Sequence, residues 1–244
     1  MEKITSTSNE IVKNTAKLSQ KKYRDENGLF IAEGEKAVKG LMNSGFKIDS
    51  LFIQKEFDIK TDKMYFVNEA VMSKLSTTKT PCEILGVFKQ KKYKKEELLK
   101  KKKLLLLENI KDGGNLGTIM RACKAFDVDS IIMLGDTIDL YNPKVVRASV
   151  GCFDIPVINI DYKDLNLFKN FSIYSTALHE NSVPLNQVTF KEPFIIAFGS
   201  EADGLSDNFL VQKTININIE MNKNVESLNL ASAVSICLYE IYKK

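Results

Sequence analysis

An asparagine lies in a glycine-rich segment that follows an apolar run, and an arginine comes four residues after that segment. The run is Leu104–Leu107, and the segment Gly113-Gly-Asn-Leu-Gly117 leads to Arg121. Four leucines without alternation predict a strand buried on both faces, and the glycines predict a tight turn after it. The spacing is not that of a dinucleotide fingerprint, and no phosphate-loop lysine follows. We expect a helix over residues 118–126 that carries Arg121 in its first turns, and a purely structural turn would explain the glycines but not this arginine.

A second polar segment follows the apolar run Phe194–Phe198. In it, Gly199 and Gly204 bracket the carboxylate of Glu201. Open parallel sheets bind ligands beyond the carboxyl ends of their strands, and a glycine there lets a ligand approach the backbone closely. Ser206 is expected to cap a short helix that follows. This segment is therefore a second candidate for a binding loop.

A third polar segment, with Glu226, Ser227 and Asn229, runs straight into an apolar helix at the C-terminus. Buried positions at helical spacing are expected at Leu230, Val234, Cys237, Leu238 and Ile241. Ser227 or Asn229 is expected to cap this helix by accepting from free backbone N–H groups. Taken alone, the segment indicates only a core helix with a capped start.

Strands and helices alternate throughout the second half of the chain. Further strands are expected over residues 130–134, 155–160, 171–176, 194–198 and 215–219, and a further helix from Pro143 to Ser149. Repeated strand–helix units predict an α/β fold with a parallel sheet and helices on its faces.

The chain is expected to form two domains joined by a linker. Residues 1–88 read as a small mixed α/β domain, residues 89–103 as a lysine-rich linker, and residues 104–244 as the larger domain. Residues 1–103 carry 23 Lys and Arg against 14 Asp and Glu, whereas residues 104–244 carry 12 against 17. A basic first half favours contact with a polyanion, although a solubilising lysine surface is an equal alternative.

The cysteines and the hydropathy pattern exclude several classes of protein. Cys82, Cys123, Cys152 and Cys237 are scattered without metal-ligand spacing, so neither a zinc site nor a disulfide framework is predicted. No apolar run approaches the ~18 residues of a membrane span. We expect a reduced, cytoplasmic protein without a membrane partner.

The three polar segments, in this order and spacing, resemble the three motifs of the SpoU (TrmH-type) RNA ribose 2′-O-methyltransferases of the SPOUT class. Asn115, Gly117 and Arg121 match the first motif, residues 199–205 the second, and residues 225–229 the third. Residues 141–151 are also similar to a family segment. At the N-terminus, Lys21-Lys-Tyr-Arg24 and Phe30-Ile-Ala-Glu-Gly34 are similar to the family's ribosomal-protein-like, substrate-binding domain, though less specifically.

The resemblance implies a fold that pattern reading does not provide. It implies a deep trefoil knot at the C-terminus that binds S-adenosyl-L-methionine, and a homodimer with its active site at the subunit interface. It also implies an RNA partner, either ribosomal or transfer RNA. The cofactor would be contacted by Thr176, Ala177, Leu178, Gly199, Gly204, Ile219 and Leu228.

The resemblance also assigns the residues that act on the ribose hydroxyl. Arg121 would act on the substrate, with Asn115, Glu201, Ser227 and Asn229 orienting it and the nucleotide. Because a guanidinium is a poor base, we expect Arg121 to bind the adjacent phosphate and polarise the hydroxyl, with the proton acceptor left open.

The chain departs from the family pattern in its third motif. Glu220 and Lys223 replace a usual proline and glycine, so a looser turn at the cofactor is expected, and Gly113 stands where proline is common. A catalytically weak RNA-binding or ribosome-associated protein is therefore the main alternative. A SPOUT enzyme that methylates a base instead of ribose is a third reading.

Overall fold

The chain folds into two compact units in the computed structural model, which describes residues 2–176, 181–222 and 224–244. The first unit consists of residues 1–92 and 139–154, and the second of residues 93–138 and 155–244. Residues 139–154 were expected, on sequence grounds, in the larger domain. They instead form part of the first compact unit.

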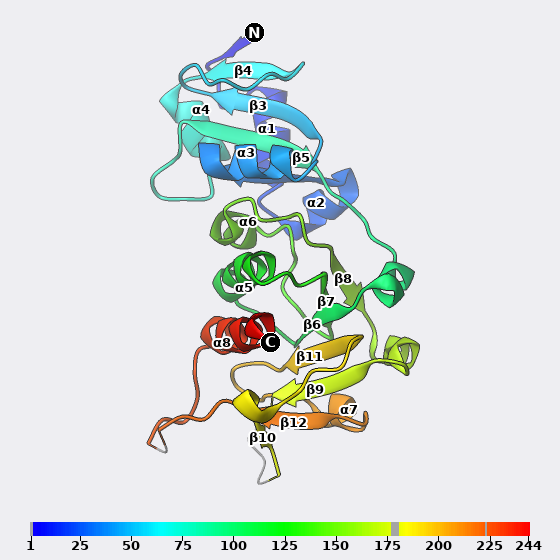
Figure 1. The fold of residues 1–244 in the computed structure, drawn as a ribbon. Coiled ribbons are helices and arrows are strands. Elements are labelled where there is room, and N and C mark those ends of the chain that lie inside the picture. Colours follow the sequence, from blue (N-terminus) through cyan, green and yellow to red (C-terminus); the bar gives the residue numbers. More distant parts are fainter. Residues whose placement is uncertain (1, 177–180, 223) are drawn as a thin grey trace. The chain divides into compact units, whose positions relative to one another are not determined.

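The second unit is built on a seven-stranded sheet in the order β10-β12-β9-β11-β6-β7-β8 (Figure 1). Its strands are β6 (Lys103–Glu108), β7 (Ser130–Leu134), β8 (Val157–Ile160), β9 (Ser172–Thr176), β10 (Val183–Pro184), β11 (Phe194–Phe198) and β12 (Ile215–Asn218). All the described strand pairs in it are parallel, which confirms the predicted α/β class and parallel sheet. The central strands β6, β7 and β11 are almost wholly buried, as their uninterrupted apolar runs require.

Helix α5 (Gly113–Ala125) begins five residues before the predicted start at residue 118. Asp112 caps it, because its side chain accepts a hydrogen bond from the backbone N–H of Asn115 at 2.8 Å. The two glycines that predicted a turn therefore form the first helical turn. Asn115 consequently lies on a helix and not in a loop.

Helix α8 (Leu230–Lys243) packs against α5, and the two lie side by side in Figure 1. The residues predicted to form its apolar stripe are buried, namely Leu230, Val234, Cys237, Leu238 and Ile241. The remaining helices of this unit are α7 (Asp207–Leu210) and the 3₁₀ helices η1 (Lys95–Lys100), η2 (Tyr162–Phe168) and η3 (Leu185–Gln187). Ser206 caps α7 as predicted, accepting from the Phe209 N–H.

The lysine-rich run between residues 89 and 103 is partly structured. It contains η1, where Leu98 is fully buried in the core of the second unit. Lys95 in the same helix pairs with Asp164 at 2.6 Å. Leu98 is what attaches the run to the core of the second unit, since a solvated chain would not bury a leucine, whereas Leu99 is 42% exposed.

The first unit contains a five-stranded mixed sheet in the order β1-β4-β3-β5-β2. Its strands are β1 (Glu2–Ile4), β2 (Leu29–Glu33), β3 (Ile48–Ile53), β4 (Met64–Val67) and β5 (Ile84–Lys89). Its helices are α1 (Glu10–Lys17), α2 (Lys21–Asn27), α3 (Glu35–Asn43), α4 (Glu69–Leu75) and α6 (Pro143–Ser149). Helix α6 begins at Pro143 as predicted, and it packs against β2 and α3.

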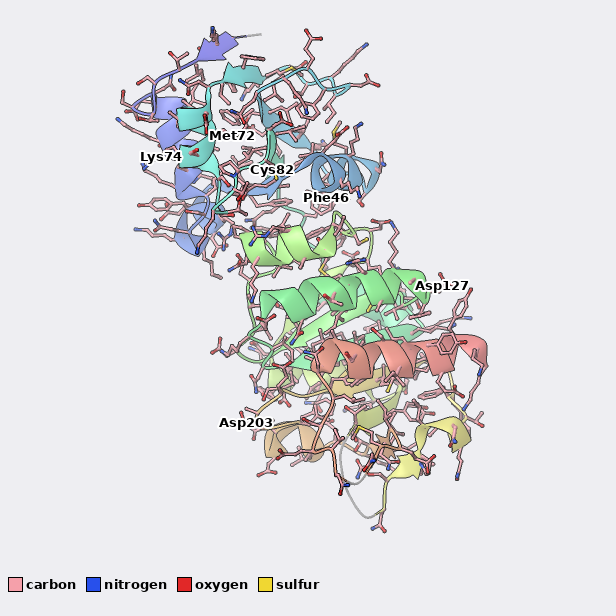
Figure 2. The ribbon with its side chains drawn as sticks, turned by 90° about the vertical axis from the view of Figure 1, so that its left-hand side faces the viewer. Phe46, Met72, Lys74, Cys82, Asp127 and Asp203 are labelled. Carbon is pink, nitrogen blue, oxygen red and sulfur yellow. The ribbon has the colours of Figure 1, made fainter. Side chains whose placement is uncertain are left out.

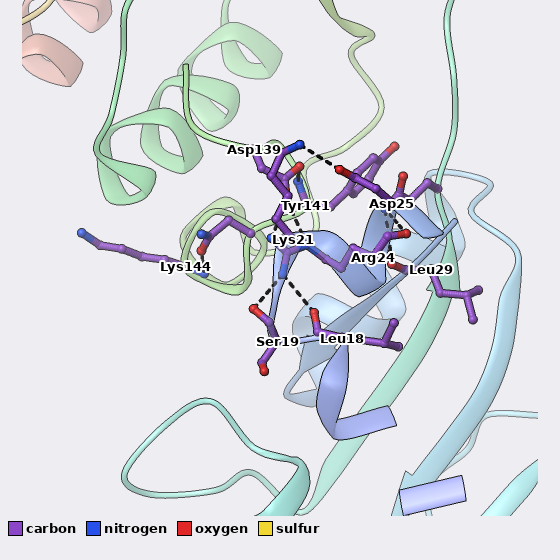
Figure 3. A network of polar contacts seen from close by, with 11 residues as sticks. Leu18, Ser19, Lys21, Arg24, Asp25, Leu29, Asp139, Tyr141 and Lys144 are labelled. Atoms are coloured by element: carbon purple, nitrogen blue, oxygen red, sulfur yellow. Dashed lines mark hydrogen bonds and ion pairs between the residues drawn. The ribbon is translucent and has the colours of Figure 1, made fainter. Parts of the chain in front are cut away.

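A buried arginine joins the two chain segments of the first unit (Figure 3). The Arg24 side chain on α2 is 2% exposed and donates to Asp139 from Nε at 2.9 Å and from Nη2 at 2.5 Å. Its Nη1 donates to the carbonyl oxygens of Leu18 and Ser19. All three guanidinium nitrogens thus donate hydrogen bonds inside the fold. Arg24 is therefore a structural residue, although it belongs to the basic segment Lys21–Arg24.

No helix within the described ranges has both the length and the apolar character that a membrane span requires.

Candidate functional site

The second unit brings two of the three polar segments together because β6 and β11 are neighbouring parallel strands. Helix α5 follows β6, and the loop of residues 199–206 follows β11, so both emerge at the carboxyl edge of the sheet. Here the Asn115 Nδ2 donates a hydrogen bond to the Glu201 Oε1 at 2.5 Å. The two residues are 86 positions apart in the sequence.

The third segment reaches the same point through Asn229. Its Nδ2 donates to the Asn115 Oδ1 at 3.1 Å and to the Glu201 Oε1 at 3.2 Å. Its Oδ1 accepts from the backbone N–H groups of Ala231 and Ser232, which makes Asn229 the N-cap of α8. One carboxamide therefore both starts the C-terminal helix and joins it to the Asn115–Glu201 pair. We call these three residues the amide–carboxylate cluster.

The loop after β11 is closed on itself by its backbone. Ser200 and Gly204 exchange N–H···O hydrogen bonds of 3.1 and 3.0 Å, and Gly204 has a left-handed φ of 68°. A Cβ at Gly199 would lie 1.8 Å from the carbonyl carbon of Gly204. Gly199 is therefore required for this closure, a reason that the sequence pattern alone did not reveal.

A cavity of about 470 Å³ opens beside this loop, a size within the range of small-molecule sites. Of the predicted cofactor-contacting residues, it is lined by Thr176, Gly199, Gly204, Ile219 and Leu228, and of the predicted catalytic residues by Glu201 and Ser227. Ala177 and Leu178 lie outside the described residues, as does Lys223. Phe198, Asn218, Met221 and Leu230 also line the cavity but were not predicted.

A second cavity, of about 460 Å³, shares a rim with the first. The shared residues are Ser200, Glu201, Asp203 and Leu230, and Asp203 is labelled in Figure 2. Asn115 lines only the second cavity, whereas Ser227 lines only the first. Glu201 of the amide–carboxylate cluster therefore stands on the boundary between the two cavities, while its partner Asn115 lines the second.

Arg121 lies two turns along α5 from Asn115 and is exposed. Within the described part of the chain, it makes neither a hydrogen bond nor an ion pair. The structure thus brings Asn115, Glu201 and Asn229 into direct contact but places Arg121 outside that cluster. An exposed guanidinium with its donors available is suited to binding an external phosphate.

A buried glutamate that was not predicted is hydrogen-bonded to the loop of residues 199–206. Glu108, at the end of β6, is completely buried and accepts hydrogen bonds from the Tyr162 hydroxyl at 2.6 Å and from Ser206. The Ser206 N–H donates at 2.8 Å and the Ser206 hydroxyl at 2.5 Å. Burial, together with the hydrogen bond to Glu108, raises the pKa of Tyr162. The sequence signal that could have revealed Glu108 is a carboxylate directly after a buried run of four leucines.

The motif geometry agrees with a comparison of the whole chain with known proteins. Residues 102–239 match the model of the SpoU rRNA Methylase family. The chain belongs to the SpoU rRNA methylase family. Residues 9–86 also match the MRM3-like substrate binding domain. The predicted family and enzyme class are therefore confirmed.

Relatives and solved structures of SpoU methylases cover nearly the full length of this chain. The 23S rRNA (guanosine(2553)-2′-O)-methyltransferase RlmP of Bacillus subtilis is 30% identical over 99% of both chains. An uncharacterised tRNA/rRNA methyltransferase of Synechocystis is 29% identical over 97% of this chain and 92% of its own. The crystal structure of an AdoMet-bound rRNA methyltransferase from Sinorhizobium meliloti superposes with a TM-score of 0.89, at 29% identity, over 99% of this chain and 97% of the other.

Proposed function

We propose that this SpoU family member transfers a methyl group from S-adenosyl-L-methionine to a ribose 2′-hydroxyl of ribosomal RNA. The observation that carries the proposal is the pair of adjoining cavities with Glu201 on their shared rim, where Asn115 and Asn229 both donate hydrogen bonds to it. A transfer reaction needs two ligands whose reacting atoms meet, and proximity of this kind supplies a large share of such a rate. The relatives are named as rRNA methyltransferases, which supports RNA as the acceptor.

The first cavity fits an adenosine-containing cofactor. Its walls combine apolar side chains, among them Phe198, Leu228 and Leu230, with polar ones such as Thr176. The Asn218 Oδ1 is buried and has no hydrogen-bond partner among the described residues, while its side chain lines the cavity. A buried polar atom without a partner is costly, so a ligand N–H group is a suitable complement. The crystal structure of the Sinorhizobium meliloti relative contains AdoMet.

The residues of the chain would act by holding the acceptor. When bound, S-adenosyl-L-methionine supplies an electrophilic methyl group. Arg121 would bind a phosphate next to the target ribose, while Asn115 and Glu201 would orient the hydroxyl at the shared rim. Ser227 lines the cofactor side and has an exposed hydroxyl for the same purpose. Asn229 would keep Asn115 and Glu201 in register through its two hydrogen bonds.

We propose that the active form is a homodimer that associates through α8. Ile236, Tyr239 and Tyr242 on this helix are 42%, 53% and 54% exposed, an unusual apolar face for a surface helix. The ring of Phe126, at the C-terminal end of α5, packs against the rings of Tyr239 and Tyr242, with ring centroids 5.9 Å apart in each pair. The apolar surface therefore extends beyond α8. A second copy would cover this face and bring further residues to the exposed Arg121.

The division of labour follows the sequence-based domains. Residues 1–88 would bind RNA, and residues 89–103 would link the domains. Residues 104–244, apart from residues 139–154 of the first unit, would catalyse methylation with a trefoil-knotted C-terminus. The substrate-binding model over residues 9–86 supports the first assignment. Methylation of ribosomal RNA would place the protein in the cytoplasm.

Two measurements on the purified chain test this proposal. Titration calorimetry should detect S-adenosyl-L-methionine binding, and a tritiated cofactor should label ribosomal RNA from cells that lack the protein. Mapping of 2′-O-methyl groups would locate the target, and transfer RNA run in parallel would decide the RNA class. Absence of binding at millimolar cofactor would replace the proposal with the RNA-binding alternative, and label on a base would favour base methylation.

A further inference from the structure

The first unit contains a cavity of about 480 Å³ that the methyl-transfer site does not use. Helices α1 and α2 form one wall, and the sheet strands β2, β3, β4 and β5 form the floor. We propose that this cavity holds one unpaired nucleotide of the RNA substrate. The inference rests on the proposed function in that it takes RNA as the substrate.

Two tyrosines give the cavity the aromatic surface that an unstacked base requires. Tyr23 on α2 and Tyr65 on β4 both line it and are each partly exposed. The ring of Tyr65 packs against the ring of Phe52, with ring centroids 5.1 Å apart. Within the described residues, neither the Tyr23 hydroxyl nor the Tyr65 hydroxyl donates or accepts a hydrogen bond. Aromatic rings that are partly exposed in a hollow stack with bases of any identity.

Lysines surround the same tyrosines. The ammonium groups of Lys17 and Lys22 each lie 5.7 Å from the centroid of the Tyr23 ring. Lys63 also lines the cavity, with its side chain 60% exposed, and its ion pair with Asp49 is long at 3.7 Å. Lys17 and Lys63 line the cavity with the single carboxylate of Asp49, and the Lys22 ammonium is 4.0 Å from Glu26. The rim thus carries one cation more than its carboxylates, which complements a phosphate backbone.

Polar groups at the cavity can read a base edge. Ser50 on the floor is 5% exposed, and its hydroxyl forms no hydrogen bond within the described ranges. Asn14 and Asn27 stand on the helical wall and carry both donors and acceptors. A single nucleotide fits this combination better than a duplex does, because paired bases present no face for stacking and a duplex cannot enter a hollow of this size.

The decisive experiment measures binding of fluorescent RNA to the full-length protein. The probes are a single-stranded 12-nucleotide RNA of mixed sequence and a duplex of the same sequence. We expect Tyr23→Leu to weaken single-strand binding by about 5- to 100-fold, because stacking is lost, whereas Tyr23→Phe should bind like the parent. Lys63→Gln should lower the salt-dependence slope by about 0.7, the share of one phosphate contact. Lys36→Gln, an exposed change on α3, is the matched control and should leave binding unchanged.

Other results would overturn the inference. It fails if Tyr23→Leu and Lys63→Gln both bind single-stranded RNA within two-fold of the parent, or if duplex binding falls equally. Photocrosslinking of 4-thiouridine RNA to the parent protein, mapped by mass spectrometry, tests the site without relying on a folded variant. Crosslinks confined to peptides other than those carrying Tyr23 and Tyr65 would also overturn it. Cofactor binding by these variants should stay intact, so a failure here is distinct from a failure of the proposed methyl transfer.

Discussion

At the scale of single residues, Arg121 and the amide–carboxylate cluster have different environments. Asn115, Glu201 and Asn229 are fixed by hydrogen bonds to one another, whereas Arg121 is exposed. A fixed cluster can orient a substrate without reorganising when it binds. An exposed cation becomes ordered only when an anionic partner arrives. We therefore assign the cluster to preorganisation and Arg121 to capture of the substrate backbone.

Arg121→Ala is expected to reduce methyl transfer by about 10- to 100-fold, because a charge-assisted hydrogen bond to the substrate phosphate contributes about 1.5–3 kcal/mol. Affinity for S-adenosyl-L-methionine should stay within two-fold, since Arg121 does not line the first cavity. Radiometric methyl transfer and calorimetry measure the two effects. Lys124→Ala, one turn further along α5, is the control and should keep activity. Full activity of Arg121→Ala would remove this residue from the mechanism.

Tyr162, which donates a hydrogen bond to the buried Glu108, makes a pH-dependent contribution to stability. The pKa of Tyr162 is raised above its ordinary value near 10, first by burial and then by its hydrogen bond to Glu108. Below pH ~10 both the folded and the unfolded states keep the phenolic proton. As pH rises, the unfolded state loses this proton first, so the stabilisation is lost as pH passes through the folded-state pKa.

Tyr162→Phe is therefore expected to lower the free energy of unfolding by about 1–2 kcal/mol at pH 8, because Glu108 loses a donor. The difference between variant and parent should shrink at a second pH above ~10, where the stabilisation by Tyr162 in the parent begins to be lost. Urea denaturation at the two pH values gives both free energies. Tyr242→Phe, at an exposed tyrosine, controls for general phenol titration. A pH-independent difference would contradict this account.

At the scale of elements, the Arg24–Asp139 pair decides where the segment of residues 139–154 belongs. Arg24 is on α2, and Asp139 precedes α6, so their contact joins elements 115 positions apart within the first unit. Gly40 on α3 and Gly151 after α6 provide a second junction. A Cβ on Gly40 would lie 2.9 Å from the Gly151 Cα. The close approach of Gly40 to Gly151 and the buried Arg24–Asp139 pair thus both hold residues 139–154 in the first unit.

Arg24→Met is expected to destabilise the first unit by about 3–5 kcal/mol, since it leaves Asp139 almost buried and without its cation. Lys21→Met on the same helix removes only an exposed pair with Asp25 and should cost less than about 1 kcal/mol. Urea unfolding followed by circular dichroism compares the two. Equal effects of the two changes would show that burial of the pair contributes little.

At the scale of the whole molecule, the proposed dimer depends on the exposed apolar face of α8. Replacing both Ile236 and Tyr239 by lysine is expected to convert a dimer into a monomer, because two charges would be buried at the contact. Light scattering coupled to size exclusion measures the mass. Val211→Lys is the control, since Val211 is 79% exposed and lies outside α8. A monomeric parent protein would refute the proposed dimer, and retained methyl transfer by a monomeric variant would refute a shared active site.

The sequence by itself determined the local features of this protein. Uninterrupted apolar runs predicted the buried strands of the second unit, and their alternation with helices predicted the parallel sheet. Ser206 and Pro143 marked helix starts correctly, because capping and proline placement depend on neighbouring residues only. The order and spacing of three polar segments were sufficient to indicate the family. Of the candidate site residues, those directly after β11 and before α8 were predictable in this way.

Only the tertiary structure decided which distant residues meet. Asn229 and Asn115 are 114 positions apart, and their contact depends on the packing of α8 against α5. The contact of Asn115 with Glu201 depends on β11 lying next to β6, an order that one sequence does not encode locally. The burial of Arg24 and the place of residues 139–154 in the first unit have the same origin. Hydrophobic pattern specifies which face of an element is buried, but the partner of that face is chosen by the packing of the whole chain.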